Sequence, residues 1–220
     1  MTERSKPRIH SRKQPKQARS NELVAAVLEA AAQVLAKEGA HRFTTARVAE
    51  KAGVSVGSLY QYFPNKAAIL FRLQSDEWKQ TSDLLRGILE DTSKPPFERV
   101  RILVHAFIRS ECEEAAMRVA LDDAAPFYRD APEAQEIKAA GRRTAERFVQ
   151  EAVPKAPKAT RALAAELMTT TLSAVGKQFS ESPRSAAQIH AYSEAMADMF
   201  CAYLDGLATT PTSKRVSVSR

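Results

Sequence analysis

The strongest constraint on the fold is the spacing of the apolar residues, which repeats with the period of an α-helix along most of the chain. Between residues 20 and 39, apolar positions recur at helical spacing, at Leu23, Val27, Ala30, Ala31, Val34 and Leu35. A half-buried β-strand instead needs alternation with period two, and no segment of useful length in the sequence shows it. The sequence therefore predicts an all-α fold.

Prolines mark the boundaries between these periodic segments. A proline inside a helix removes a hydrogen bond and ends or kinks the helix, and most of the 11 prolines fall between the apolar-periodic stretches. We expect one helix over residues 20–39, two short helices within 44–63, and longer ones over 65–92, 96–124, 131–152, 157–180 and 185–208. Residues 1–19 are polar and aperiodic, which predicts a flexible arm, and residues 209–220 predict a disordered tail.

The composition favours a soluble protein with a packed core. Hydrophobic residues make up 44% of the chain. The sequence contains no run of about 18 apolar residues, which is the length needed to span a bilayer. No apolar run of the kind found in a signal peptide follows the basic N-terminus. The two cysteines, Cys112 and Cys201, are far apart in the sequence, so no disulfide framework is expected. We expect a cytoplasmic protein in a reducing compartment.

The net charge of +7 comes from the first third of the chain. Residues 1–66 contain 12 Lys and Arg against five Asp and Glu, whereas residues 67–220 contain 21 of each sign. Seven of the basic side chains lie within residues 1–19. A basic head on a neutral body favours a polyanion as the partner of the head, although a solvated, disordered tail would show the same run of charge.

Residues 43–66, FTTARVAEKAGVSVGSLYQYFPNK, have the pattern of a helix-turn-helix. Thr44 and Ser55 are suited to cap two short helices, and the apolar residue before each cap can pack against a residue of the following turn. Gly53 permits a positive φ in the turn. Two short helices joined by a glycine-containing turn of about three residues form the helix-turn-helix motif, which predicts that this segment binds DNA.

The run from Gly53 to Lys66, GVSVGSLYQYFPNK, resembles the DNA-binding domain of the tetracycline-repressor (TetR) family, and the resemblance extends over residues 20–70. It implies a three-helix DNA-binding head, a fourth, connecting helix and a helical body that binds a ligand and dimerises. At position 46 the chain has alanine where some members carry a base-reading arginine, which argues against a base contact from this helix. We therefore expect a basic arm (1–19), a helix-turn-helix DNA-binding domain (20–66), a ligand-binding and dimerisation domain (67–208) and a tail (209–220).

The second helix of the motif is expected to lie in a groove of DNA. Leu59, Tyr62 and Phe63 face inward at helical spacing, and the outward positions are Val56, Gly57, Ser58, Tyr60 and Gln61. Glycine and serine are poor helix formers, so their presence here fits close approach to a groove better than helix stability. We expect the five outward residues to contact bases, with Gln61 suited to adenine and Val56 to a thymine methyl group. A solvated face without a ligand is the alternative for each.

Phosphate contacts are expected from helix starts and from the arm. Lys66 follows the capping Asn65 at the start of a helix, where a cation is unfavourable beside the helix dipole unless an anion also binds. Thr45 can offer its hydroxyl and backbone amide to another phosphate. The family resemblance implies phosphate contacts for Thr45, Tyr62 and Lys66. Salt-sensitive contacts are expected from the arm, through Lys13, Lys16 and Arg19.

The body supplies candidates for a ligand pocket and a dimer interface, although burial in the core is the alternative for most of them. The resemblance places a pocket among the middle helices, which selects Trp78, His105, Phe107, Cys112, Met117, Leu121, Phe127, Phe148 and Met168. In the family the last two helices pair across a two-fold axis, which selects Leu163, Leu167, Thr171, Tyr192, Met196, Phe200 and Tyr203. For these stripes, burial within one subunit is the alternative.

The remaining chemistry of the sequence favours a regulator over an enzyme. His10, His41, His105 and His190 are too scattered to predict a metal site, and no cofactor is expected. No glycine-rich phosphate loop and no Ser/His/Asp order supports catalysis. We expect a homodimeric transcriptional regulator, most simply a repressor, that binds a palindromic double-stranded DNA operator and is released by an unidentified small molecule. A sequence-neutral nucleic-acid-binding protein is the alternative, because the charge distribution alone would suffice for it.

Overall fold

The computed structural model describes residues 18–39, 41–115, 117, 121 and 132–209, and every regular element in these ranges is an α-helix. The predicted all-α fold is confirmed. Most of the predicted arm (1–19) and tail (209–220) lies outside the described residues; of their described ends, residues 18 and 19 belong to α1 and residue 209 belongs to α9. Within the described ranges, no helix has an apolar stretch long enough to cross a lipid bilayer.

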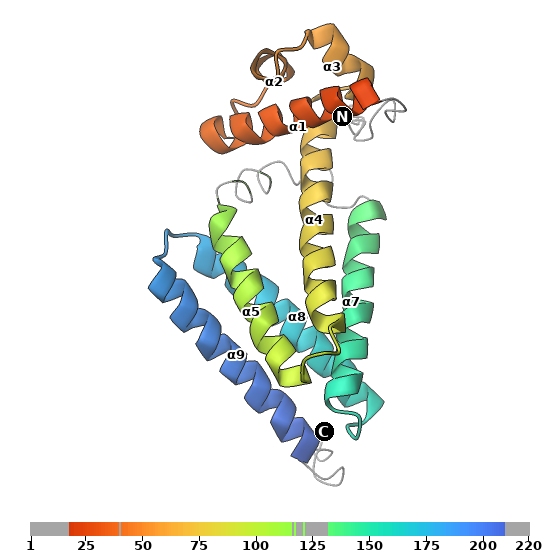
Figure 1. Ribbon diagram of the computed structural model, residues 1–220, viewed down its shortest axis with the longest axis vertical. Helices are drawn as coiled ribbons and strands as arrows, with labels where there is room; N and C mark the ends of the chain where they lie inside the picture. Colours follow the sequence, from red (N-terminus) through yellow and green to blue (C-terminus); the bar gives the residue numbers. More distant parts are fainter. Residues whose placement is uncertain (1–17, 40, 116, 118–120, 122–131, 210–220) are drawn as a thin grey trace, which may run out of the picture. The chain divides into compact units, whose positions relative to one another are not determined.

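The chain packs as two compact units, which are described separately. The first unit comprises residues 1–79 and 116–135, and the second comprises residues 80–115 and 136–220. The first contains α1 (Ala18–Glu38), α2 (Thr45–Lys51), α3 (Val56–Tyr62) and the start of α4 (Lys66–Glu90), as drawn in Figure 1. The second contains the end of α4, α5 (Pro96–Glu113), most of α7 (Pro132–Ala152), α8 (Lys158–Ser180) and α9 (Ala186–Thr209).

The division between the units falls inside α4 because the start of this helix belongs to the first core. Ala67, Ala68, Ile69, Leu70 and Phe71 are all buried, and most of them pack with residues of α1, α2 and α3. The two compact units divide at residues 79 and 80, whereas the sequence predicted a domain boundary at residue 66. The boundary at residue 66 stays a prediction as the division between the DNA-binding and ligand-binding functions.

Prolines stand at helix starts in the structure. Pro96 and Pro132 are the first residues of α5 and α7, and Pro157 directly precedes α8. Proline fits the first turn of a helix because its missing N–H would have no intrahelical partner there. The helix expected over residues 96–124 is shorter in the structure, because α5 ends at Glu113 and the backbone of Glu114 leaves the regular helical conformation (φ −103°, ψ 10°).

The first unit is built around the two capped helices of the helix-turn-helix. The Thr44 side chain accepts a hydrogen bond from the backbone N–H of Arg47, and the Ser55 side chain accepts one from Ser58, at 3.3 and 3.0 Å. Gly53, in the turn between them, has a φ of 66°, a conformation that residues with a side chain rarely adopt. The predicted caps and the predicted positive φ are confirmed.

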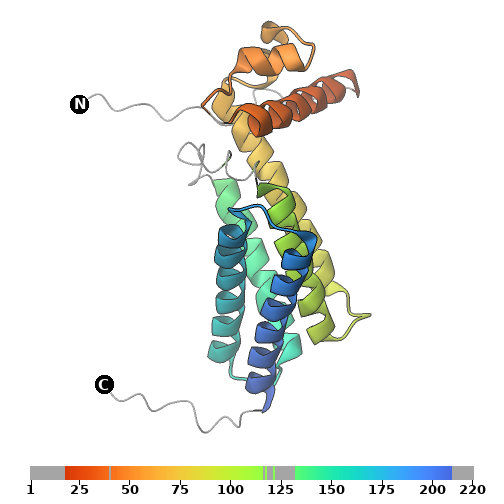
Figure 2. The same ribbon diagram turned by 90° about the vertical axis from the view of Figure 1, so that its left-hand side faces the viewer.

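The second unit consists of long helices that pack around a shared apolar core. Helix α5 packs against both α8 and α9, and Figure 2 shows α8 and α9, the darker blue helices, on the side that faces the viewer. Gly176 of α8 lies so close to Phe107 of α5 that a Cβ atom at this glycine would come within 2.7 Å of the ring. A side chain at position 176 would hold the two helices apart.

A buried arginine joins three helices of the second unit. Arg99 of α5 is only 1% exposed, and its guanidinium donates to the Leu89 carbonyl at 2.5 Å and forms an ion pair with Glu151 of α7. The same group lies 5.3 Å from the centre of the Phe148 ring. The last carbonyls of a helix have no intrahelical partner, so Arg99 supplies one for the end of α4 while its own charge is compensated.

Candidate nucleic-acid interface and ligand cavity

Helix α3 has one buried side and one exposed side. Leu59 is fully buried, whereas Val56 and Tyr60 are each 39% exposed although both are large and apolar or aromatic. Gly57 and Gln61 are exposed as well. Ser58 is half-buried, and its hydroxyl lies 2.8 Å from that of Ser55. Four of the five predicted base-contact residues are thus open to solvent, and the fifth, Ser58, is hydrogen-bonded to the Ser55 that caps α3.

The start of α2 contacts the exposed side of α3. Thr45, the first residue of α2, has its hydroxyl 3.1 Å from the Tyr60 hydroxyl. Neither α2 nor α3 has an acidic residue in its first turn, so both helix starts keep the positive potential that attracts an anion. This arrangement suits a phosphate near Thr45 and a base edge near α3.

At the start of α4, Asn65 caps the helix and Lys66 occupies the first helical position, as the sequence predicts. The Asn65 side chain accepts a hydrogen bond from the backbone N–H of Ala68 at 2.9 Å, and Lys66 is exposed at the first helical position. Tyr62 is half-buried and packs against the first core. In the arm, Lys13 and Lys16 lie outside the described residues, and Arg19 falls in the first turn of α1.

The second unit contains a small apolar cavity that is partly open to its surroundings. Its volume is about 40 Å³, and residues from α4, α5, α7, α8 and α9 line it, among them Leu103, Phe148, Met168, Leu172 and Phe200. A ligand of drug size needs roughly 300–1,000 Å³. The cavity as it stands admits only a few atoms, so a larger ligand would require the surrounding helices to separate.

The predicted pocket residues do not all meet at this cavity. Phe148 and Met168 line it. Trp78, Met117 and Leu121 pack with the core of the first unit and do not line this cavity, so their role in a ligand pocket stays a prediction. Sequence position alone could not separate the two cores, because the chain returns to the first unit at residue 116.

Three other predicted pocket residues have different surroundings, and a fourth is outside the described residues. Phe107 is buried beside Gly176. Cys112 is half-buried, and burial raises the pKa of its thiol, which opposes a nucleophilic role because the thiolate is the nucleophile. His105 is half-buried between α5 and α9. Phe127 is the residue outside the described ranges.

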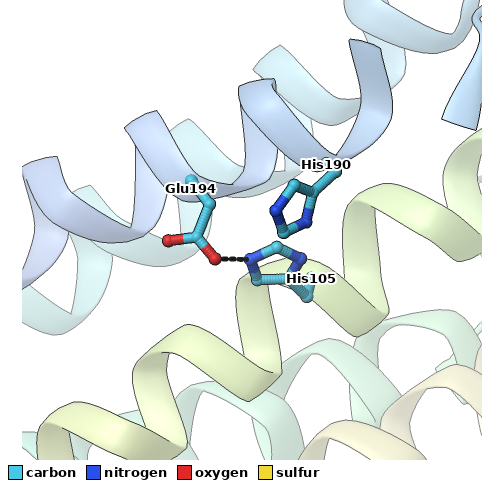
Figure 3. Close-up of side chains that lie close together, drawn as sticks. All are labelled: His105, His190 and Glu194. Carbon is cyan, nitrogen blue, oxygen red and sulfur yellow. Dashed lines mark hydrogen bonds and ion pairs between the residues drawn. The ribbon is translucent and has the colours of Figure 1, made fainter. Parts of the chain in front are cut away.

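His105 belongs to a cluster that the sequence did not reveal. Its Nε2 atom lies 2.8 Å from Oε1 of Glu194, and the rings of His105 and His190 have their centres 5.3 Å apart. Figure 3 shows the three side chains converging between the two helices. The sequence indicated that the four histidines are too scattered to predict a metal site, but the structure brings this pair together beside Glu194. Only the four-residue spacing of His190 and Glu194 was visible in the sequence.

The predicted interface residues divide into exposed and buried sets. Leu163 and Leu167 of α8 are 59% and 48% exposed, whereas Met196 and Phe200 of α9 are buried in the second core. The burial of these two residues within one chain matches the alternative stated for them, and their interface role stays a prediction. Thr171, Tyr192 and Tyr203 are half-buried, and the Tyr192 ring stacks on Phe179 with centres 4.0 Å apart.

Two family models match the chain. The model described as "Bacterial regulatory proteins, tetR family" matches residues 27–73. The model described as "Tetracyclin repressor-like, C-terminal domain" matches residues 95–207, just over half of the chain. The first match includes the complete helix-turn-helix, and the second includes α5, α7 and α8 and most of α9.

Curated relatives match over shorter stretches. The nucleoid occlusion factor SlmA of Vibrio campbellii is 37% identical over 83 residues, which are 37% of this chain and 42% of that protein. The fatty acid metabolism regulator protein of Bacillus subtilis is 37% identical over 54 residues, which are 24% of this chain and 28% of that protein. The chain therefore spans less than half of the length of these relatives.

Solved structures share the fold at low sequence identity. A TetR-family transcriptional regulator of Pectobacterium atrosepticum is 20% identical with a TM-score of 0.65, covering 90% of this chain and all of that one. The regulator FadR of Bacillus subtilis, in complex with stearoyl-CoA, is 16% identical with a TM-score of 0.63, covering 80% of this chain and 96% of that one. Together with the two family models, this shared fold shows that the chain belongs to the tetracycline-repressor (TetR) family of transcriptional regulators.

Proposed function

We propose that the chain is a homodimeric, ligand-responsive transcriptional repressor of the cytoplasm that binds a palindromic DNA operator through α2 and α3. The observation that carries the proposal is the exposed side of α3, where Val56 and Tyr60 are both open to solvent. Their exposure has no benefit for the stability of the first unit. Apolar side chains are suited to thymine methyl groups, and the neighbouring Gln61 amide is suited to adenine.

Phosphate contacts from Thr45, Tyr62 and Lys66 would hold α3 in register on the duplex. Such contacts position a protein on DNA without reading its sequence. Lys13 and Lys16, which precede α1, and Arg19, in its first turn, would add further contacts to the DNA backbone. The net charge of +7 within residues 1–66 supports this role, because each neutralised phosphate releases counterions and increases affinity.

Dimerisation would place two copies of α3 on successive turns of one face of DNA. Two-fold symmetric proteins bind half-sites about 34–36 Å apart or at a multiple of that distance, which makes the operator palindromic. The exposed apolar residues of the last two helices, Leu163, Leu167 and Met199, support a dimer face there. Leu163 and Leu167 lie one helical turn apart on α8, and adjacent exposed apolar side chains favour association with a partner.

The effector is proposed to be a small molecule with an apolar part that enters the cavity around Phe148 and Met168. The apolar lining supports this class of ligand. FadR of Bacillus subtilis was solved with stearoyl-CoA, which shows that this fold can hold an apolar chain in another protein. Because the cavity has only about 40 Å³, ligand entry would move the helices. Ligand and operator would then weaken each other's binding equally, typically by 1–3 kcal/mol.

The decisive experiment selects DNA from a random pool with the untagged full-length protein. The selected duplex then competes with scrambled DNA of equal length and composition. We expect the selected sequence to be palindromic and to bind about 1,000-fold more tightly than the scrambled one. Equal binding of both duplexes would overturn the proposal and support the alternative, a sequence-neutral nucleic-acid-binding protein, for which the basic first third of the chain is sufficient.

A further inference from the structure

We propose that His105, His190 and Glu194 form a binding site for one divalent transition-metal ion of the zinc class. Each residue offers one ligand atom, and these three atoms lie within 4.8 Å of one another. In Figure 3 the imidazoles and the carboxylate point toward the same space between α5 and α9. The site uses neither the cavity nor the helix-turn-helix, so it stands independently of the proposed function.

Helix geometry holds the donors in place. His190 and Glu194 are four residues apart on α9, and residues at this spacing lie on the same face of a helix. His105 comes from α5, which packs along α9. The 2.8 Å hydrogen bond between His105 Nε2 and Glu194 Oε1 has already brought two donor atoms together. A metal ion would take the place of the proton between them.

The donor set selects the class of ion. Two imidazole nitrogens and one carboxylate oxygen are typical ligands of Zn²⁺, at about 2.0–2.2 Å, and three protein ligands leave a fourth tetrahedral position for water. Ligand atoms of such an ion lie about 3.3–3.5 Å apart, so His105 Nε2 and Glu194 Oε1 would separate slightly from their 2.8 Å contact and the exposed His190 ring would turn toward them. Mg²⁺ and Ca²⁺ need six or more oxygen ligands, which this cluster does not offer.

The surrounding charges permit a cation. Arg101 lies 3.2 Å from Oε2 of Glu194 and 2.5 Å from the Asp198 carboxylate. Its guanidinium therefore binds the carboxylate oxygen that faces away from His105 and leaves Oε1 directed at the histidine. A hydrogen-bonded outer partner orients a metal ligand in this way. Arg101 carries one positive charge, and the Glu194 and Asp198 carboxylates carry two negative charges, so these three groups do not oppose the binding of a cation.

The test uses untagged, full-length protein that has been stripped with a chelator and dialysed. Isothermal titration with ZnCl₂ should give one ion per chain, and CoCl₂ should give the intense visible absorption of tetrahedral coordination, which ZnCl₂ removes. Excess MgCl₂ should leave the absorption unchanged. Absence of saturable zinc binding, or zinc binding that MgCl₂ abolishes, would overturn the proposal.

Three variants and one control assign the ion to the cluster. His190→Ala and Glu194→Gln alter residues that are exposed or half-buried, so both variants should fold, and His105→Ala completes the set. Each should weaken zinc binding by about 100-fold or more, because even loss of an outer partner costs 10- to 100-fold. His41→Ala is the matched control, since His41 is exposed in the first unit. If the His190→Ala and Glu194→Gln variants bind zinc as tightly as the control, the site lies elsewhere and the proposal is wrong.

Discussion

The hydroxyl of Tyr60 lies 3.1 Å from the hydroxyl of Thr45, so the exposed side of α3 is hydrogen-bonded to the first turn of α2. The two residues have different proposed partners, a base edge for Tyr60 and a phosphate for Thr45. Their hydrogen bond restricts both side chains before DNA arrives. Groups that are already ordered lose less conformational freedom on binding, so the bond should contribute to affinity while adding little to folding.

A double-mutant cycle of Thr45→Val and Tyr60→Phe measures this contribution. Each single variant should weaken binding to the selected operator, and the double variant should lose less than the sum of both by about 0.5–1.5 kcal/mol, the usual net value of one hydrogen bond. Fluorescence anisotropy with labelled operator gives the affinities. Stability in urea should change by no more than about 0.5 kcal/mol, as is usual at exposed sites. Additive losses would show that the two hydroxyls act separately.

Gln61→Ala should change which operator the protein prefers. Loss of a bidentate contact to adenine costs about 1–3 kcal/mol of discrimination at one base pair, so affinity for the selected operator should fall while affinity for a duplex altered at that pair stays the same. Gln33→Ala is the control, because Gln33 is an exposed glutamine of α1. Equal losses on every duplex would exclude a base-reading role for Gln61.

Lys66→Ala should weaken binding to all DNA sequences uniformly. If Lys66 neutralises one phosphate, the slope of log affinity against log salt concentration should become shallower by about 0.9. Lys158→Ala is a matched control, since Lys158 is also an exposed lysine at the first position of a helix. Both substitutions remove a cation from the positive end of a helix dipole, so only the proposed phosphate contact distinguishes them. An unchanged salt slope for Lys66→Ala would contradict that contact.

The features that the sequence predicted correctly are local ones. The caps at Thr44 and Ser55 and the positive φ of Gly53 depend on residues within one turn of helix. Each follows from the chemistry of one side chain and its immediate neighbours. Helix starts near prolines were predictable for the same reason.

The features that the sequence did not predict depend on distant packing. His105 and His190 meet only because α5 lies against α9. Phe200 and Met196 were assigned to an interface because helical spacing identifies an apolar stripe without saying what covers it. In the structure, the core of their own chain covers them. Trp78 was expected in a ligand pocket because its place in the sequence does not show which of two cores it joins.

Leu167→Lys should convert the proposed dimer to a monomer. Leu167 is 48% exposed on α8, and a charge buried without a partner in an interface is strongly unfavourable. Sedimentation equilibrium should show at least about tenfold weaker self-association, and operator affinity should fall with it. Leu84→Lys is the matched control, because Leu84 of α4 is also 48% exposed but lies outside the proposed interface. Equal masses for the two variants would remove the support for a dimer face on α8.

Gly176→Ala should destabilise the chain, although alanine is the better helix former. A Cβ atom at this position would lie 2.7 Å from the Phe107 ring and 3.3 Å from Cγ of Glu111. Overpacking of this kind costs about 1–3 kcal/mol, which exceeds the gain in helix propensity of up to about 1 kcal/mol.

Gly141→Ala should instead stabilise by about 0.5–1 kcal/mol, because Gly141 is an exposed glycine within α7 and a Cβ atom there would meet nothing within 4 Å. Urea denaturation measures both free energies of unfolding. If Gly176→Ala were as stabilising as Gly141→Ala, α8 and α5 would have room to separate at this crossing, and the glycine would not be what sets their close approach.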